Sequence, residues 1–236
     1  MKKVAILQSN YIPWKGYFDI IDAVDEFVLY DDMQFTKNDW RNRNIIKTSN
    51  GTQRLTIPVV TKGKFYQKII ETEVLSSKWI KKHWHAIQCN YARAACFDEY
   101  AGVIRELYEK CEEEKYLSKI NYIFLKGICD ILGIETKISW SSEYDFGEGK
   151  TEKLVNICKQ AGADEYLSGP AASDYIDKKL FDDADIVLTY MDYSGYPEYP
   201  QLYGTFVHGV TILDMIFNLG SQTRKYMKKA AFQDRT

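Results

Sequence analysis

The chain has 236 residues, of which 45% are hydrophobic and 27% are charged, and its net charge is −2 at pH 7. This size fits one large domain or two small ones, and the composition is typical of a soluble globular protein. The near-zero charge excludes a general attraction to nucleic acid or membranes, and no segment approaches the roughly 20 apolar residues of a membrane span. Five cysteines without a CxxC pair, and an N-terminus without a signal peptide, predict reduced, buried thiols in a cytoplasmic protein.

The first 75 residues open with a β-α-β unit. Pro13 followed by helical apolar spacing through Phe18, Ile21 and Val24 predicts a helix between two strands. The pair Asn50-Gly51 lies between two β-like runs, which predicts a hairpin. The expected strands cover residues 3–8, 26–30, 44–48, 53–59 and 68–74.

The middle of the chain is predicted to be helical. Ser76 and Ser77 are candidate caps for a helix that runs to about residue 95, and Gly133 fits the end of a later helix. Further helices are expected near 98–113 and 118–132, then at 151–161 with Thr151 as its cap, at 210–219 and from about 221, before a polar tail. Strands are expected at 136–140, 165–167 and 186–193.

This alternation predicts an α/β fold with a Rossmann-like, mainly parallel sheet, a β-hairpin and a helical insertion. A nucleotidyltransferase-like or HUP-like arrangement is the variant of this fold that we also consider. Residues 1–75 and 133–236 form the expected α/β core, and residues 76–132 form the insertion or subdomain. Ligands of such sheets bind beyond the carboxyl ends of the strands, which directs attention to the loops at 8–14, 31–43, 168–170 and 192–203.

The segment 31–47, DDMQFTKNDWRNRNIIK, combines carboxylates, cations, amides and an indole directly after a strand. Lys37, Arg41 and Arg43 are candidates for phosphate, since guanidinium groups supply forked donors. Asp31 and Asp32 are candidates for a base or a Mg²⁺ ligand. Adjacent strand side chains point to opposite faces, so we expect only one of the two acids to face a site.

Three other segments carry weaker signals. The run Gln8 to Tyr17 reads either as an anion-binding loop, with Gly16 allowing close approach, or as a tight strand-helix turn. Gly147 and Gly149 ahead of Lys150 resemble an incomplete phosphate loop, and an ordinary capped helix is the favoured interpretation. Ser168 lacks the GxSxG context of a nucleophile, and no Cys/His cluster predicts zinc.

Four long motifs resemble the WbqC-like family. The family pattern "ILQxxYxPWxGYFD" appears at 6–19, "DDxQxxKxxWRNRNxIK" at 31–47, "YLSGPAxxxY" at 166–175, and "YPQLxGxFxxxxSILDxxFNxG" at 199–220. Ser9 stands where proline is common in the pattern, and Thr211 stands where serine is usual. Members are associated with bacterial O-antigen and surface-polysaccharide gene clusters, so the resemblance implies a sugar-modifying transferase.

The resemblance implies acylation or aminoacylation of the amine of a nucleotide-linked amino sugar, with a small acyl or amino-acid donor. The expected catalytic residues are Asp32, Lys37 and Ser168. The expected substrate-binding residues are Gln8, Asn10, Tyr11, Trp14, Gly16, Asp31, Gln34, Trp40, Arg41, Asn42, Arg43, Gly169, Tyr175, Tyr203 and His208. No metal ligand is expected in this scheme, and the high aromatic content is typical of a homodimer interface or a sugar platform.

Two alternatives remain open. The chain is also similar to adenylate-forming enzymes of the pantothenate-synthetase type, whose HxGH motif is replaced here by Trp14-Lys15-Gly16-Tyr17. That reading predicts a carboxylate-amine ligase that uses ATP and Mg²⁺, although both phosphate-stabilising histidines are missing. The other alternative is a non-catalytic protein that binds a sugar nucleotide.

Overall fold

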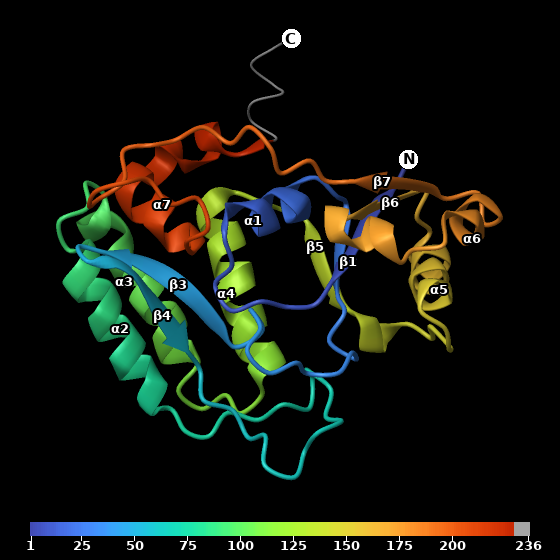
Figure 1. Ribbon diagram of the computed structural model, residues 1–236, viewed down its shortest axis with the longest axis horizontal. Coiled ribbons are helices and arrows are strands. Elements are labelled where there is room, and N and C mark those ends of the chain that lie inside the picture. The colour runs from blue at the N-terminus through green and yellow to red at the C-terminus, as the bar shows by residue number, and fades with distance from the viewer. Residues whose placement is uncertain (229–236) are drawn as a thin grey trace.

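A five-stranded parallel sheet forms the centre of the computed structural model, which describes residues 1–228 (Figure 1). Its strands are β1 (Lys3–Leu7), β2 (Glu26–Leu29), β5 (Lys137–Trp140), β6 (Glu165–Ser168) and β7 (Val187–Tyr190). They are ordered β5-β2-β1-β6-β7, and each neighbouring pair is parallel. The chain therefore winds outward in both directions from β1, which confirms the predicted α/β fold and places a topological switch point between β1 and β6.

A separate antiparallel hairpin lies beside this sheet. It consists of β3 (Arg43–Thr48) and β4 (Gly51–Thr56), and Gly51 turns the chain with φ +111°. The Asn-Gly signal therefore predicted the hairpin correctly. The strand predicted over residues 68–74 is wrong, because Glu71 and Thr72 donate backbone hydrogen bonds to the carbonyls of Lys68 and Ile69 and form turns. Only isolated bridges remain in that segment.

The seven α-helices among the described residues match most of the predicted ones. They are α1 (Lys15–Asp22), α2 (Lys78–Tyr91), α3 (Phe97–Lys110), α4 (Leu117–Leu132), α5 (Thr151–Ala161), α6 (Lys178–Asp182) and α7 (Ile212–Leu219). Gly133 ends α4 in the left-handed conformation, as its place after the apolar pattern predicted. Shorter 3₁₀ helices span Ser141–Glu143, Pro170–Asp174 and Gly220–Tyr226.

Some local predictions need correction. Ser77 precedes α2 but its side chain makes no capping hydrogen bond, and Thr151 is the first helical residue of α5 rather than its cap. The Thr151 hydroxyl instead accepts the backbone N–H of Asp177. Strand β7 is shorter than predicted, α6 was not predicted, and the segment from Ser221 is a 3₁₀ helix; residues 229–236 of the predicted tail lie outside the described residues.

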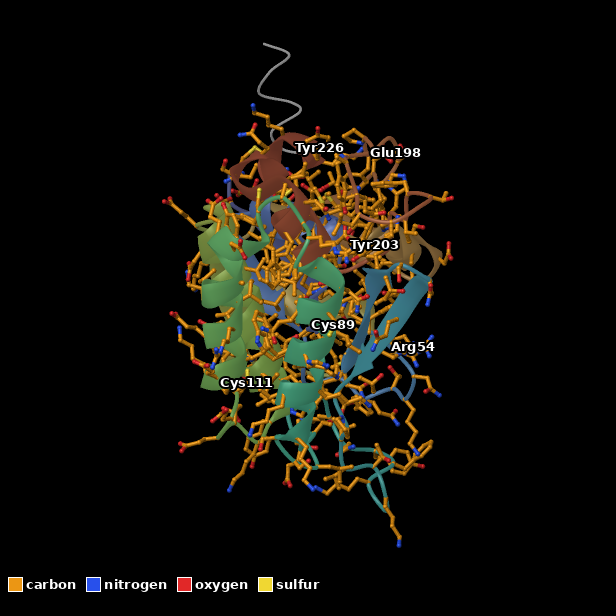
Figure 2. All side chains as sticks on the ribbon, turned by 90° about the vertical axis from the view of Figure 1, so that its left-hand side faces the viewer. Arg54, Cys89, Cys111, Glu198, Tyr203 and Tyr226 are labelled. Atoms are coloured by element: carbon orange, nitrogen blue, oxygen red, sulfur yellow. The ribbon has the colours of Figure 1, made fainter. Side chains whose placement is uncertain are left out.

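Both faces of the sheet are covered by helices, as strand alternation requires. On one face, Ala5, Phe27 and Leu167 contact a large core that includes side chains from α1, α2, α3, α4 and α7. On the other face, Val4 and Ile6 contact a smaller core with side chains from α5 and α6. None of the five cysteines forms a disulfide; Cys111 is buried as predicted, whereas Cys89 on α2 is exposed (Figure 2).

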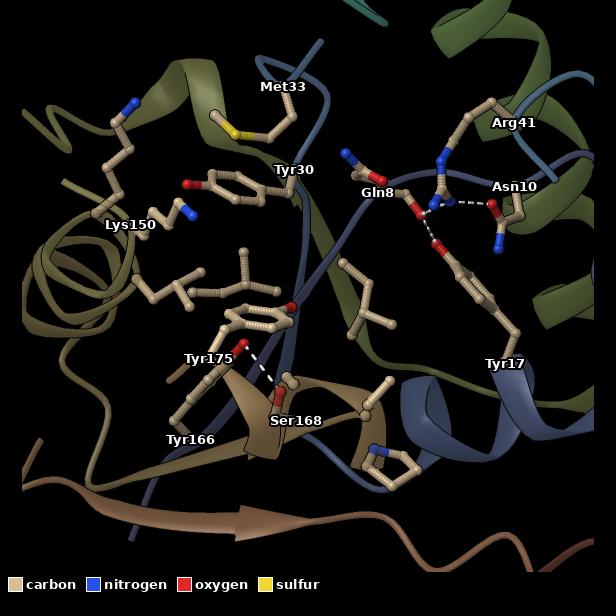
Figure 3. Close-up of a pocket in the computed structure, with 18 of the residues that line it drawn as sticks. Gln8, Asn10, Tyr17, Tyr30, Met33, Arg41, Lys150, Tyr166, Ser168 and Tyr175 are labelled. Carbon is tan, nitrogen blue, oxygen red and sulfur yellow. Dashed lines mark hydrogen bonds between the residues drawn. The ribbon is translucent and has the colours of Figure 1, made fainter. Parts of the chain in front are cut away.

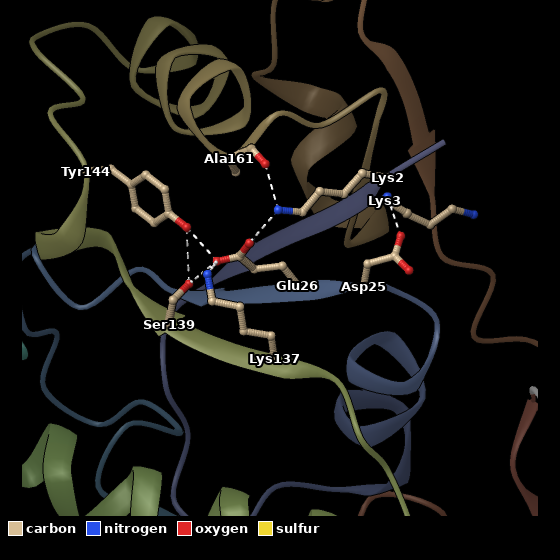
Figure 4. A network of polar contacts seen from close by, with 8 residues as sticks. All are labelled: Lys2, Lys3, Asp25, Glu26, Lys137, Ser139, Tyr144 and Ala161. Carbon is tan, nitrogen blue, oxygen red and sulfur yellow. Dashed lines mark hydrogen bonds and ion pairs between the residues drawn. The ribbon is translucent and has the colours of Figure 1, made fainter.

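The amino end of β2 carries a buried carboxylate. Glu26 accepts from Lys2 and Lys137, each at 2.8 Å, from the Ser139 hydroxyl at 2.8 Å and from the Tyr144 hydroxyl at 2.5 Å (Figure 4). Burial alone would raise the pKa of Glu26, but these four donors hold the pKa at about 2, below its ordinary value of 4.5. The network joins Lys2, just before β1, to strands β2 and β5 near the amino ends of the strands.

We expect Glu26→Gln to lower the free energy of unfolding by about 1–3 kcal/mol, because two lysines lose their charged partner. A carboxyl whose pKa is depressed in the folded state contributes stability above its unfolded pKa. The difference in free energy of unfolding between wild type and Glu26→Gln should therefore reach its full value above pH 4.5 and shrink as the pH falls toward about 2. Urea unfolding across this range measures it.

Asp25→Asn is the matched control, since Asp25 is exposed and, among the described residues, its carboxylate accepts a hydrogen bond only from the Lys3 backbone N–H on the neighbouring strand. We expect a smaller loss of stability for this change. Equal stability of wild type and Glu26→Gln at pH 7 would contradict the role of the network.

Candidate functional site

A cavity of about 720 Å³ opens at the switch point, beyond the carboxyl ends of β1 and β6 (Figure 3). Parallel strands that diverge at such a point leave a crevice between the loops that follow them. Its lining comes from the loop after β1, the segment after β2, the start of α5, and the turn after β6. All four loops that the sequence pattern indicated contribute to the lining, the fourth through Tyr193, together with the start of α5.

The charges on the cavity wall are all positive. Arg41, Lys150 and Lys153 line the cavity, and within the described residues no aspartate, glutamate or histidine does so. Lys150 immediately precedes α5 and Lys153 lies in its first turn, where the helix dipole also favours a negative group. Neither lysine forms an ion pair in the part of the chain that the structure describes. The wall is therefore suited to an anion.

The Arg41 guanidinium is held in place on the opposite side of the cavity from Lys150. It donates to the side-chain oxygen of Asn10 and, at 3.4 Å, to the backbone carbonyl of Gln8. Asp39 forms an ion pair with it at 3.6 Å. Its Nε is enclosed and has no hydrogen-bond partner in the structure.

Aromatic rings supply most of the flat surface of the cavity. Trp14, Tyr30 and Tyr175 line it, together with Tyr17, Tyr166 and Tyr193. Burial raises the pKa of Tyr30 to about 12, so its hydroxyl stays protonated and can donate at neutral pH. Tyr175 is largely exposed, and in the view of Figure 3 its ring lies between Tyr30 and Ser168, where it offers a flat surface to a ligand.

Buried polar contacts fix the loop after β1. Asp31 has no solvent exposure, and its carboxylate accepts the Ser9 N–H at 2.8 Å and the Ser118 hydroxyl of α4. The Tyr17 hydroxyl donates to the Gln8 carbonyl at 2.8 Å. Burial raises the pKa of Asp31 above its ordinary value. Asp31 thus positions the cavity wall without lining it.

The same loop contains a strained residue. Ile12 is buried and has φ +40°, a conformation that a β-branched residue rarely adopts. The Asn44 side-chain amide of β3 donates to the carbonyls of Tyr11 at 3.0 Å and Ile12 at 2.8 Å. The hairpin therefore holds the loop in a conformation that it would not adopt by itself.

Ser168 is buried at the end of β6 and lines the cavity beside Gly169. Its hydroxyl donates to the Tyr166 hydroxyl over 3.4 Å. No histidine among the described residues contacts it. The proposed catalytic role of Ser168 stays a prediction.

The structure brings nine of the candidate residues together and leaves the others apart. Those that line the cavity are Gln8, Asn10, Trp14, Gln34, Arg41, Ser168, Gly169 and Tyr175, and Gly16 lies directly behind Trp14. Those that do not line it are Tyr11, Asp31, Asp32, Lys37, Trp40, Asn42, Arg43, Tyr203 and His208. Lys37 and Trp40 are exposed, and Arg43 donates to the Asn38 side chain at 3.2 Å.

Several of the remaining candidates have structural partners. The Tyr11 hydroxyl contacts His83 at 2.9 Å and Tyr108 at 2.8 Å inside the core, and Asn42 donates to the Ile57 carbonyl at 2.8 Å. Asp32 pairs with Lys68 at 3.2 Å and accepts the Ser141 hydroxyl at 2.8 Å. Asp31 and Asp32, which follow β2, contact different groups as expected, but neither lines the cavity.

Tyr203 and His208 belong to a different part of the molecule. The Tyr203 hydroxyl donates to the Asn90 carbonyl in α2 at 3.0 Å (Figure 2). His208 lies 3.4 Å from the amine of Lys15, which is buried beside the rings of Tyr196 and Tyr199. Burial lowers the pKa of Lys15 to about 8.

The sequence patterns missed Lys150, Lys153 and most of the tyrosines as site residues. Two glycines ahead of Lys150 were visible as a signal, but the GxxxxGK[ST] spacing is incomplete, so an ordinary helix start was favoured. Residues 1–228 contain no cluster of three or more His, Cys, Asp or Glu side chains placed to hold a metal ion. Within the same residues, no helix has the length and apolar character needed to cross a membrane.

A substitution at Gly16 tests how the cavity wall is packed. A Cβ at this position would overlap the indole ring of Trp14, which also packs against Tyr193 and Tyr196. We expect Gly16→Ala to displace Trp14, lower the stability by about 1–3 kcal/mol and change the tryptophan fluorescence. Gly102→Ala in α3 meets no atom within 4 Å and should leave stability unchanged or slightly raised. Equal melting temperatures for Gly16→Ala and wild type would contradict this packing.

Comparison with known proteins agrees with the motifs. The model of the WbqC-like protein family matches residues 8–226. A protein of Mycobacterium tuberculosis (strain ATCC 25618 / H37Rv), described as "Uncharacterized protein Rv1507c", is 51% identical over 228 residues, covering 97% of this chain and 98% of that protein. No solved structure gives a significant match. The chain belongs to the WbqC-like protein family.

Proposed function

We propose that the chain is a transferase that binds a nucleotide-linked amino sugar in the switch-point cavity and acylates or aminoacylates its amine. The observation that carries the proposal is the set of Arg41, Lys150 and Lys153 on a cavity wall with no carboxylate among its described residues. Such a wall favours a ligand with several negative charges, as a sugar diphosphate has. The association of family members with O-antigen gene clusters supports an activated sugar as that ligand.

In this proposal each part of the substrate contacts a different part of the cavity lining. Lys150, Lys153 and the start of α5 are placed to bind the diphosphate through charge and backbone N–H groups. Tyr30 and Tyr175 are the rings nearest to Lys150 in Figure 3 and are placed to flank the base. The side-chain amides of Gln8, Asn10 and Gln34 are suited to reading sugar hydroxyls on the far side.

In the transfer step the sugar amine attacks the carbonyl carbon of the donor. A nitrogen–carbon bond forms, the bond to the donor's leaving group breaks, and the nitrogen loses one proton. The Arg41 guanidinium, kept in orientation by Asn10 and Asp39, is placed to stabilise negative charge on the carbonyl oxygen. Asp32 as base, with Lys37 and Ser168, stays a prediction, because its carboxylate is engaged by Lys68 and Ser141.

One observation favours an ATP-dependent ligase as the second candidate. The strand order places the cavity where nucleotides bind in doubly wound sheets, and its cations suit a triphosphate equally well. In that reaction a carboxylate attacks ATP, pyrophosphate leaves, and the sugar amine then displaces AMP. Release of pyrophosphate that depends on a carboxylic acid distinguishes the ligase from the transferase.

We expect the double change Lys150→Ala and Lys153→Ala to raise the Kd for UDP, dTDP or GDP at least about tenfold, since each lost charge-assisted contact costs about 1 kcal/mol or more. Isothermal titration with each nucleoside diphosphate measures this, preceded by a thermal-shift panel that also includes ATP and CoA with and without Mg²⁺. Lys159→Ala, in the last turn of the same helix and outside the cavity, is the matched control. A Kd that the double variant leaves unchanged would sink the assignment of the diphosphate site.

The reaction itself is tested by mass spectrometry of the sugar. Nucleotide-linked amino sugars are incubated with acyl-CoA donors, or with amino acids and ATP, and the product is expected to gain the mass of one acyl or aminoacyl group. The matching N-acetylated sugar nucleotide, which has no free amine, should remain unchanged. Tight binding without any mass gain would favour the remaining alternative, a protein that binds the sugar nucleotide without catalysis.

A further inference from the structure

A loop at residues 61–67 presents two aromatic rings to solvent. Phe65 is 70% exposed and Tyr66 is 82% exposed, and apart from Met1 they are the most exposed large hydrophobic side chains of the described residues. Their ring centroids lie 5.0 Å apart in an edge-to-face arrangement. Rings that remain this exposed gain little from folding, so their exposure indicates a contact surface.

The loop also encloses a groove of about 540 Å³ lined by Gly63, Lys64, Phe65, Tyr66, Gln67 and Glu71. Gln67 is only 8% exposed, and its amide nitrogen donates to the Val60 carbonyl at 2.8 Å. Its amide oxygen is enclosed by protein atoms and has no hydrogen-bond partner among the described residues. Gln67 therefore fixes the loop through Val60, and the groove surface is supplied by the two rings and the exposed side chains beside them.

Direct contacts attach this loop to the rim of the switch-point cavity. Gln34, which lines that cavity, donates its side-chain amide to the Phe65 carbonyl at 2.9 Å. Gln34 and Lys68 also form an antiparallel bridge, and Lys68 pairs with Asp32 at 3.2 Å. A ligand in the groove would therefore adjoin a ligand in the cavity.

The charges around the groove favour a neutral occupant. Lys68 pairs with Asp32, Lys64 lies 3.7 Å from Glu73, and Glu71 itself lines the groove. Among the described residues, the charged ones that line the groove are Lys64 and Glu71, and Lys62 of the same loop is not part of the lining. A lining with one cation and one carboxylate has no net charge to attract a phosphate or an anionic membrane surface. Aromatic faces next to a carboxylate instead match a ring that has apolar C–H faces and hydroxyl donors at its edge.

We propose that this groove is a saccharide subsite that takes a second, uncharged sugar ring. This subsite rests on the proposed function, because it would hold a sugar next to the nucleotide-linked sugar in the cavity. Phe65 and Tyr66 contact the C–H face of this ring. The exposed Glu71 carboxylate accepts hydrogen bonds from its hydroxyl groups.

Saturation-transfer-difference NMR with the methyl glycosides of glucose, galactose, mannose, rhamnose and N-acetylglucosamine tests the proposal on the full chain. At least one glycoside should receive saturation from the wild-type protein. The double change Phe65→Ala and Tyr66→Ala should raise its Kd at least about tenfold. Tyr190→Ala removes an exposed ring of β7 that lines neither cavity and should not affect it. Melting temperatures verify that both variants are folded.

The subsite is overturned if no glycoside receives saturation, or if the double variant binds as tightly as the wild type. A titration of the wild-type protein with UDP, dTDP and GDP is run in parallel. Nucleotide binding without glycoside binding refutes the subsite alone. Glycoside binding that depends on Phe65 and Tyr66, without nucleotide binding, supports the subsite and refutes the diphosphate site.

Discussion

The Asp31 carboxylate connects the parts of the molecule that build the cavity. Its oxygens accept the backbone N–H of Ser9 after β1 and the hydroxyl of Ser118 in α4. One turn further along α4, the Asn121 amide donates to the Ser9 hydroxyl and to the Arg41 carbonyl, each at 2.9 Å. The buried face of α4 therefore fixes the loop after β1 and the segment that contains Arg41. Because each contact is shielded from water, losing one leaves a buried group unpaired at a cost of about 1–3 kcal/mol.

This arrangement also explains why the cavity is positive although the chain as a whole is slightly negative. The acids of the segment 31–47 do not line the cavity: Asp31 is bonded inside the core, Asp32 pairs with Lys68, and Asp39 pairs with Arg41 from outside the lining. Lys150 and Lys153 add charge from a distant part of the chain. The net charge of a chain therefore does not predict the charge of a site, because the fold determines which charged side chains line that site.

The chain has the unusual number of 18 tyrosines, and several of them donate hydrogen bonds to buried carboxylates. The Tyr91 and Tyr199 hydroxyls donate to Asp214 at 2.9 and 2.6 Å, Tyr196 donates to Asp19, and Tyr144 donates to Glu26. Burial raises the pKa of Asp19 to about 6 and also raises that of Asp214. A tyrosine fills core volume and at the same time supplies the donor that a buried carboxylate needs. The pairs of Tyr196 and Tyr199 attach the segment 196–208 to α1 and α7, and the pair of Tyr91 joins α2 to α7.

The sequence by itself determined the elements that depend on local chemistry. Apolar periodicity, the Asn50-Gly51 pair and Gly133 predicted the strands, the hairpin and the end of α4, since these signals act within a few residues. The motifs also identified the family, and the polar loops pointed to the carboxyl edge of the sheet. What the tertiary structure decided is which side chains of those loops face the same space. Asp31 and Asp32 are neighbours in sequence and neither lines the cavity, whereas Arg41 and Lys150 lie far apart in sequence and line the same cavity from opposite sides. Side-chain direction and the pairing of charges depend on long-range packing, and no local pattern carries that information.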